Sequence, residues 1–270
     1  MATTRIDKRF DLLAAASRTA LIPYIMAGDP QPDATVPLMQ TLVKSGGDLI
    51  ELGVPFSDPM ADGPIIQAAG ERALRHHVSL GDVIGMVAEF RQSDGDTPVV
   101  LMTYQNPIEA MGEAQFVASA VAAGVDGVLV VDLPIEEADT LLKEVEGEAL
   151  DIIFLTSPTT SVERLKRIAE VARGFIYYVS LKGVTGAKHI ELEQIADKVK
   201  QFKNIITIPT AVGFGIHDEQ SAKRVAQLAD AVVVGSAIVR IVEQNADANY
   251  RQRVADFVVG LRSAIDEKTS

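Results

Sequence analysis

The sequence predicts an α/β fold of the (β/α)8 TIM barrel class, formed as one domain over residues 1–270. Eight short runs rich in β-branched residues are each followed by a longer amphipathic stretch, with no linker between them. Several runs, including 127–131 and 231–235, are apolar on both faces, which is typical of parallel strands covered by helices. The alternative, an open doubly wound sheet, would be favoured by a Gly-x-Gly-x-x-Gly turn after the first strand. That strand ends Met26-Ala-Gly-Asp-Pro instead, which favours the barrel.

The predicted elements alternate along the chain. Strands are expected at residues 19–26, 49–53, 99–104, 127–131, 151–155, 174–180, 205–209 and 231–235. Helices are expected at residues 34–45, 114–123, 135–145, 162–172, 192–201, 219–228 and 251–265. An extra N-terminal helix over residues 4–17 is expected to cap the barrel floor. Two helical patterns, at 65–75 and 80–92, predict an insertion after the second strand.

Composition excludes several function classes. The chain has 37 acidic and 25 basic residues, a formal charge of −12, which disfavours binding to nucleic acid. It contains no cysteine, so disulfides, thiolate metal sites and a cysteine nucleophile are excluded. The first residues form no apolar signal region, and no apolar stretch reaches the ~18 residues that cross a bilayer. We therefore expect a cytoplasmic protein that does not contact membranes. The four histidines lack metal-ligand spacing, so no metal is expected either.

Two carboxylates follow strongly apolar strands at the end of the barrel where chemistry is expected. Glu51 lies inside a strand end, before Leu52 and Gly53, and Asp132 follows the fourth strand. Burial there would raise the pKa of a carboxyl group that has no partner. The alternative for each is an ion pair with a lysine or a cap on the next helix. This alternative carries more weight for Asp132 than for Glu51.

The loop after Glu51 is short, rigid and polar. Its sequence is Val54-Pro-Phe-Ser-Asp-Pro-Met-Ala-Asp-Gly-Pro, and it can bring Asp62 back over the barrel mouth beside Glu51. Two carboxylates in different environments can divide their roles, one passing a proton while the other stays ionised. The alternative is a plain turn in which Asp62 caps the helix that begins at Pro64.

Glycines follow the last three strands, at Gly183-Val-Thr185-Gly186, Gly213-Phe-Gly215 and Gly235-Ser236. Such turns let backbone N–H groups approach an anion, and phosphate sites after the last strands are frequent in these barrels. Any single glycine could simply permit a tight turn. Three such turns on adjacent strands favour a phosphate site, and residues 183–189 are long enough to form a lid.

The segment from Glu51 to Gln67 (ELGVPFSDPMADGPIIQ) resembles the tryptophan synthase alpha chain family. Segments at 21–30, 131–134, 183–186 and 212–215 agree in order. The resemblance implies a lyase that cleaves indole-3-glycerol phosphate to indole and glyceraldehyde 3-phosphate, with no cofactor on this chain. It also implies that indole passes to a beta chain that carries pyridoxal phosphate, in an α2β2 complex.

The resemblance also implies roles for individual residues. Glu51 matches the catalytic acid and base, Asp62 the acid that binds the indole N–H, and Tyr177 the tyrosine beside Glu51. The remaining matches are Gly186, Gly215, Gly235 and Ser236 for phosphate, Tyr24, Tyr104, Val131, Ile153 and Phe214 for the indole pocket, and Asp58, Pro59, Asp132 and Thr185 for the lid and communication with the partner.

Three alternatives stay open. One is a stand-alone lyase that releases free indole without gaining from a partner. Another is a non-catalytic regulatory subunit, against which the presence of both Glu51 and Asp62 argues. The last is a sugar-phosphate isomerase barrel, which shares only the phosphate turns.

Overall fold

The computed structural model describes residues 3–179, 188–213, 215–244 and 249–267. Within this part of the chain, every strand belongs to one sheet in the order β5-β4-β3-β2-β1-β9-β8-β7-β6, and every pair of neighbours is parallel. The strands are β1 (Ala20–Met26), β2 (Ile50–Gly53), β3 (Val99–Thr103), β4 (Gly127–Val130), β5 (Asp151–Ile152), β6 (Leu155–Thr156), β7 (Ile176–Val179), β8 (Thr210–Gly213) and β9 (Ala231–Val234).

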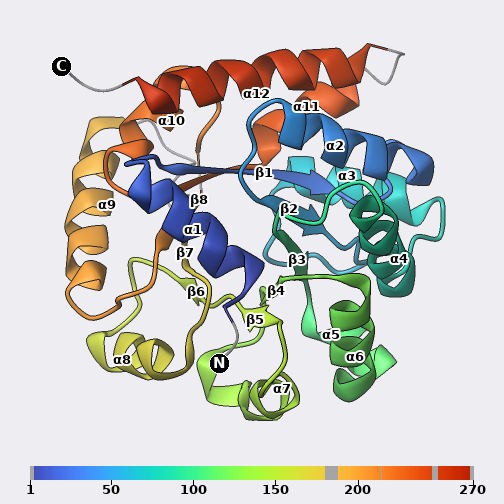
Figure 1. The fold of residues 1–270 in the computed structure, drawn as a ribbon, viewed down its shortest axis with the longest axis horizontal. Helices are drawn as coiled ribbons and strands as arrows, with labels where there is room; N and C mark the ends of the chain where they lie inside the picture. Colours follow the sequence, from blue (N-terminus) through green and yellow to red (C-terminus); the bar gives the residue numbers. More distant parts are fainter. Residues whose placement is uncertain (1–2, 180–187, 214, 245–248, 268–270) are drawn as a thin grey trace.

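The chain between β5 and β6 closes this sheet into a barrel. The two short strands are separated by Ile153 and Phe154 only, so they are two halves of the fifth predicted strand. The N–H of Ile153 donates to the carbonyl of Val128 at 2.8 Å, and the N–H of Tyr177 donates to the carbonyl of Phe154 at 3.1 Å. The segment therefore bonds to β4 on one side and to β7 on the other, and the helices surround the ring (Figure 1).

The helices confirm most of the predicted pattern. They are α1 (Arg5–Ala15), α2 (Thr35–Lys44), α3 (Pro64–Leu74), α4 (Leu80–Arg91), α5 (Gln105–Met111), α6 (Glu113–Ala123), α7 (Asp139–Glu144), α8 (Val162–Val171), α9 (Lys188–Lys203), α10 (Glu219–Ala226), α11 (Ser236–Gln244) and α12 (Tyr250–Asp266), with 3-10 turns at Pro32–Ala34 and Ile135–Glu137. The N-terminal helix and the two helices inserted after β2 form as predicted, whereas α5 and α11 are additional. In the described part of the chain, no helix is both long and apolar enough to span a membrane.

The seventh predicted strand was wrong in position. Residues 205–209 form the turn after α9, and β8 begins only at Thr210. The N–H groups of Ile205 and Ile206 both donate to the carbonyl of Phe202 at 2.8 Å, as in a closing helical turn. Pro209 also has no N–H for a strand ladder. The apolar pattern of these two isoleucines therefore reflects packing at the end of a helix and not a strand.

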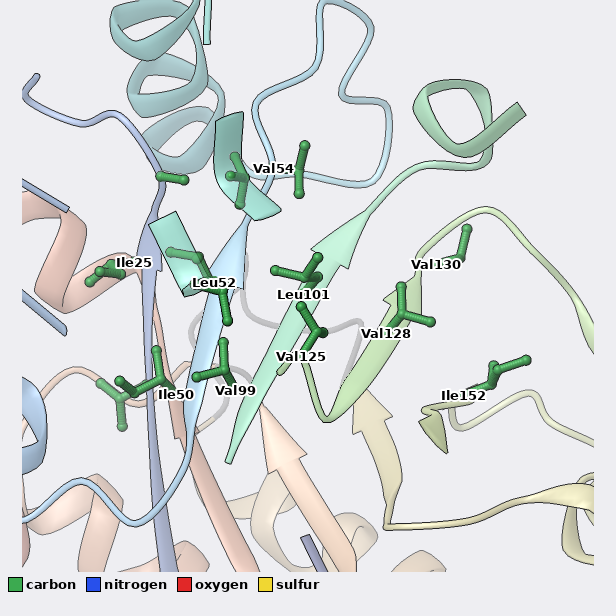
Figure 2. Close-up of a cluster of buried hydrophobic side chains, with 14 of the residues drawn as sticks. Ile25, Ile50, Leu52, Val54, Val99, Leu101, Val125, Val128, Val130 and Ile152 are labelled. Atoms are coloured by element: carbon green, nitrogen blue, oxygen red, sulfur yellow. The ribbon is translucent and has the colours of Figure 1, made fainter. Parts of the chain in front are cut away.

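Alternate strand residues divide the core into two parts. Side chains on the outer face of the strands, such as Ile50 and Leu52 on β2, pack in the cluster between the sheet and the helices that Figure 2 shows in close-up. Inward-facing side chains, such as Ile22 and Val100, fill the barrel interior. Glu51 lies between two outward-facing residues and therefore points into the barrel.

Helix α1 closes the N-terminal end of the barrel. Its buried residues Ile6, Phe10 and Leu13 join the interior cluster, and the ring of Phe10 lies 5.8 Å from that of Phe175. Ile6 also lies against Gly127 and Gly174 at the N-terminal ends of two strands. In Figure 1 the helix lies across the ring of strands. Apolar side chains of α1 therefore fill this end of the barrel, and a ligand site is expected at the opposite end.

A repeated aspartate ties the strands together at the barrel floor. Three strands are each preceded by an aspartate. The carboxylate of each aspartate accepts a hydrogen bond from an N–H at or just after the start of the neighbouring strand. The pairs are Asp48 with Leu21 at 2.9 Å, Asp126 with Val99 at 2.7 Å and Asp230 with Thr210 at 2.9 Å. Each carboxylate also pairs with a basic side chain: Arg262, Arg5 together with Arg91, and Lys203, respectively. Charge at the floor is thus structural, which sets it apart from the carboxylates at the mouth.

Candidate active site

Glu51 is a buried acid on β2 in the upper part of the barrel. Its residue is 3% exposed, and within the described part of the chain its Oε1 atom has no hydrogen-bond partner. Burial, with the negative charge of Asp62 as a second cause, raises the pKa of Glu51 to about 8. The side chain can therefore hold a proton near neutral pH and still release it.

The loop after β2 brings Asp62 toward the same pocket. Its carboxyl group is half-buried, and burial raises the pKa of Asp62 to about 6, while a hydrogen bond with Tyr104 opposes that rise. Helix α3 begins after Gly63, which makes no side-chain cap bond. Gly63, and not Asp62, therefore occupies the cap position of that helix, contrary to the alternative in which Asp62 caps it.

Tyr104, at the end of β3, fixes the loop that carries Asp62. Its hydroxyl accepts the N–H of Ala61 at 3.0 Å and is also hydrogen-bonded to the Asp62 carboxylate. Its ring packs against Phe56 with the centroids 5.0 Å apart. From α3, the side chain of Gln67 donates to the carbonyl of Asp62 at 2.9 Å. The loop is therefore held from two directions, by Tyr104 and by Gln67, and Tyr104 also contacts the carboxylate itself.

Two further tyrosines cross the barrel mouth over glycines. A Cβ atom at Gly53 would collide with the hydroxyl of Tyr24, and one at Gly213 would collide with the hydroxyl of Tyr177. Burial and the charge of Glu51 raise the pKa of Tyr177, so both phenols stay neutral. Gly53 was not among the residues predicted from the sequence. Its position two residues after the inward-facing Glu51 is the signal that could have found it.

Several apolar residues lie in or against the cluster that fills the barrel interior. Ile153 is 1% exposed and lies in the interior cluster, against which the half-buried Val131 packs. Met102 and Leu155 pack against the same cluster, and the sequence analysis missed both. Strand alternation could have identified Met102, because it lies two residues before Tyr104 on the same face.

The glycine turns after β8 and β9 lie at the same end of the barrel. Gly215 is exposed, has a φ of +65°, and has open space where a Cβ would be. Gly235 lies beside the ring of Tyr24 and directly precedes α11, whose first residue is the exposed Ser236. The free N–H groups of a helix start carry partial positive charge, which suits an anion.

The remaining predicted residues lie outside this cluster or outside the described residues. Asp58 is exposed in the loop after β2, where it accepts a bond from the Ser57 hydroxyl at 2.7 Å, and Pro59 is half-buried. Asp132 is exposed, and its Oδ1 accepts the N–H of Gln105 at 2.8 Å, which caps the start of α5. Because α5 precedes Asp132 in the chain, this contact is not the cap on the following helix that the alternative described. Thr185, Gly186 and Phe214 fall outside the part of the chain that the structure describes.

A charged network beside the mouth was not expected from the sequence. Arg72 of α3 donates to both carboxylate oxygens of Asp29, at 2.7 and 3.0 Å, and to Glu243 of α11 at 2.9 Å. It joins the loop after β1 to the two helices that follow β2 and β9. Asp62 lies in the loop just before α3, and Ser236 begins α11, so the network links the helices that follow these two residues. Within the described residues, no group of three or more acidic or histidine side chains could hold a metal ion.

The chain is similar over nearly its whole length to known tryptophan synthase alpha chains. The family model described as tryptophan synthase alpha chain matches residues 10–266. The alpha chain of Nitrosomonas europaea is 56% identical over 265 residues, which cover 98% of this chain and 96% of that one. The alpha chain of Thioalkalivibrio sulfidiphilus is 55% identical, over 97% of this chain and 100% of that one.

Solved structures agree in fold. The tryptophan synthase subunit alpha of Legionella pneumophila superposes with a TM-score of 0.92 at 46% identity, over 98% of this chain and 99% of that chain. A chain of Mycobacterium tuberculosis tryptophan synthase superposes with a TM-score of 0.90 at 37% identity, over 99% of this chain and 100% of that chain.

Proposed function

The chain belongs to the tryptophan synthase alpha chain family, and from this premise we propose how its own residues carry out the family's reaction. Members of the family are lyases of tryptophan biosynthesis that cleave indole-3-glycerol phosphate to indole and glyceraldehyde 3-phosphate. The observation that carries the proposal is the buried Glu51, which shares an apolar pocket mouth with the second carboxylate Asp62.

Glu51 acts as the acid and then as the base. The aromatic ring must be protonated at C3 before the bond between C3 and the glycerol chain can break, and the protonated Glu51 supplies that proton. The resulting carboxylate accepts the proton of the glycerol hydroxyl next to the breaking bond. That oxygen forms the aldehyde carbonyl, and the electrons of the broken bond return to the ring. The carboxyl group ends in its starting state.

Asp62 stabilises the charge that this protonation creates. Positive charge develops on the ring nitrogen, and an ionised carboxylate at the N–H lowers its energy. The pKa of Asp62, about 6, lies below that of Glu51, about 8, so near neutral pH Asp62 is ionised while Glu51 is protonated. The contact with Tyr104 holds the carboxylate in place, which supports this division of roles.

Backbone groups after the last strands bind the phosphate. Gly215, Gly235 and Ser236 lie at the same end of the barrel as Glu51, and α11 begins at Ser236. We propose Gly186 as the fourth phosphate-binding residue. Phosphate bound away from the reacting atoms supplies binding energy that fixes the indole ring beneath Glu51. Tyr24, Tyr104, Val131, Ile153 and Phe214 line the indole pocket, with Tyr177 beside Glu51.

The family name implies a beta-chain partner. We propose an α2β2 complex in which the beta chain holds pyridoxal phosphate and consumes the indole, while this chain carries no cofactor. Asp58, Pro59, Asp132 and Thr185 form the lid and the route of communication with that partner. The chain functions as one barrel domain in the cytoplasm.

Product analysis with and without the partner tests the proposal. Purified chain is incubated with indole-3-glycerol phosphate, and indole and glyceraldehyde 3-phosphate are quantified, alone and with a beta chain. We expect slow release of both products in equal amounts, and strong acceleration by the beta chain. Fast release without acceleration would indicate a stand-alone lyase. Complex formation without cleavage would indicate a regulatory subunit, and absence of indole together with sugar-phosphate isomerisation would indicate an isomerase.

A further inference from the structure

Tyr24 carries a buried hydroxyl group that lacks a strong partner. The residue is 3% exposed on β1, and the contact found for its hydroxyl within the described residues is the thioether of Met26 at 4.0 Å. Sulfur is a weak acceptor, and a buried phenol normally finds a stronger one. The hydroxyl lies over Gly53, where no side chain competes for the space. The donor is therefore free to serve another group in the pocket.

The neighbouring strand, β2, carries a buried hydrogen-bond acceptor that lacks a partner among the described residues. Tyr24 and Glu51 are direct partners in the register of β1 and β2, and both side chains point into the barrel. Glu51 Oε1 is buried and has no partner among the described residues. Gly53, on which the hydroxyl rests, is the next inward-facing residue after Glu51 on the same strand. The weakly paired donor and the acceptor without a partner among the described residues thus occupy adjacent places on neighbouring strands.

Other titratable groups face the same space. Asp62 reaches it from the loop after β2, Tyr104 from the end of β3 and Tyr177 from β7. The negative charge of Asp62 raises the pKa of Tyr24 more than the charge of Glu51 does. Asp62, however, is half-exposed and already bonded to Tyr104. The hydroxyl of Tyr177, whose pKa the charge of Glu51 raises, lies over Gly213 on β8. Glu51 is therefore the fully buried carboxylate that a donor from Tyr24 would stabilise most.

We propose that Tyr24 is a positioning residue whose hydroxyl donates a hydrogen bond to the Glu51 carboxylate once Glu51 has given up its proton. The bond stabilises the charged form of Glu51 in a buried site and orients the carboxylate for the return of the proton. Tyr24 acts through Glu51 and does not itself exchange a proton with the substrate. The inference rests on the proposed function of Glu51.

Tyr24→Phe tests the proposal, with Tyr178→Phe as the matched control. Tyr178 is also a buried tyrosine, but it lies on the outer face of β7, where its ring packs on Phe202 at 5.5 Å. In the complex with a beta chain, Tyr24→Phe should lower kcat about tenfold with KM nearly unchanged, as expected for a lost hydrogen bond to a charged group. The basic limb of its kcat profile should move to higher pH. Tyr178→Phe should leave kcat and this limb as in the wild type.

A second readout does not depend on catalysis. The pKa of the Glu51 carboxyl is measured by 13C NMR in glutamate-labelled chain, with Glu51→Gln used to assign the signal. It should be higher in Tyr24→Phe than in wild type and unchanged in Tyr178→Phe. Equal titration of Glu51 in all three proteins would overturn the proposal, as would a raised KM with normal kcat. A wild type that releases no indole would refute the proposed function, while the NMR titration would still decide whether Tyr24 and Glu51 interact.

Discussion

The negative charge of Asp62 raises the pKa of Glu51, although one residue belongs to a strand and the other to the loop that follows it. Burial is the larger cause, and Asp62 adds to it. The pocket thus contains one carboxyl group that keeps its proton to about pH 8 and a second one that loses its proton near pH 6. This separation is what a proton donor beside a fixed charge requires.

The pH dependence of kcat should follow this pair. Activity requires a protonated Glu51 and an ionised Asp62, so kcat should fall as the pH drops below about 6 and again as it rises above about 8. Because the groups interact, the two limbs report the pair as a whole. Initial rates of indole release between pH 5 and pH 10, at saturating substrate, measure the profile. A flat profile across this range would contradict the assignment.

Replacement of Asp62 by asparagine should separate its effect on the developing cation from its effect on the pKa of Glu51. The loss of a charge that stabilises the developing cation should lower kcat by about a hundredfold. The basic limb should move to lower pH, because the pKa of Glu51 loses the contribution of a neighbouring negative charge. The pH–rate profile of Asp62→Asn, compared with the wild type, checks both effects. A shift of that limb to higher pH would show that Asp62 does not repel the charge on Glu51.

Ionisation of the buried Glu51 should lower the stability of the folded chain at high pH. Its pKa is about 8 in the folded chain against 4.5 as the ordinary value, so the folded protein holds this proton more tightly than the unfolded chain does. The free energy of unfolding should therefore fall as the pH rises from about 4.5 to about 8, by up to about 5 kcal/mol from this group.

Glu51→Gln removes this titration and keeps the shape of the side chain. The difference in unfolding free energy between Glu51→Gln and wild type should grow in favour of the variant across this pH window and level off above it. Urea denaturation at several pH values measures the difference, in which the other groups largely cancel. A difference that stays constant with pH would mean that Glu51 titrates normally in the folded protein.

Gly53 should resist substitution because of Tyr24. An alanine Cβ there would collide with the Tyr24 hydroxyl, so Gly53→Ala should cost about 1–3 kcal/mol of stability. The double variant Gly53→Ala/Tyr24→Phe should recover part of that loss, because the closest colliding atom is gone while the ring atoms Cζ and Cε2, at 2.7 and 2.9 Å, still crowd the Cβ. Gly85→Ala is the control: Gly85 is an exposed residue of α4 with open space at its Cβ, and alanine there should stabilise the helix by about 0.5–1 kcal/mol. Thermal or urea unfolding measures all three variants. Equal losses in the single and the double variant would show that the collision does not limit this position.

The barrel and the position of Glu51 could be predicted from local pattern. Runs apolar on both faces indicate buried parallel strands, and a lone acid inside such a run must either be paired or have a shifted pKa. Asp62 could be placed near Glu51 because its loop is short. The sequence did not reveal that Tyr104 holds this loop, since that contact joins residues 43 positions apart.

Other features depend on tertiary contacts that one sequence does not display. The apolar Ile205 and Ile206 suggested a strand, but hydrophobicity alone does not distinguish a strand from the end of a packed helix. The fifth strand is split because its first half bonds to β4 and its second to β7, which only closure of the ring determines. The network of Arg72 joins three segments distant in sequence and follows from the packing of α3 against α11.

Turnover by Glu51→Gln tests the central claim, that a buried Glu51 transfers the proton, most directly. Indole release and binding of indole-3-glycerol phosphate are measured for the variant and the wild type, each in complex with a beta chain. The account predicts that kcat falls by about a hundredfold or more while the dissociation constant of the substrate changes little, because glutamine keeps the shape of the side chain but not the proton. Turnover close to that of the wild type, in a variant that binds substrate normally, would contradict the account.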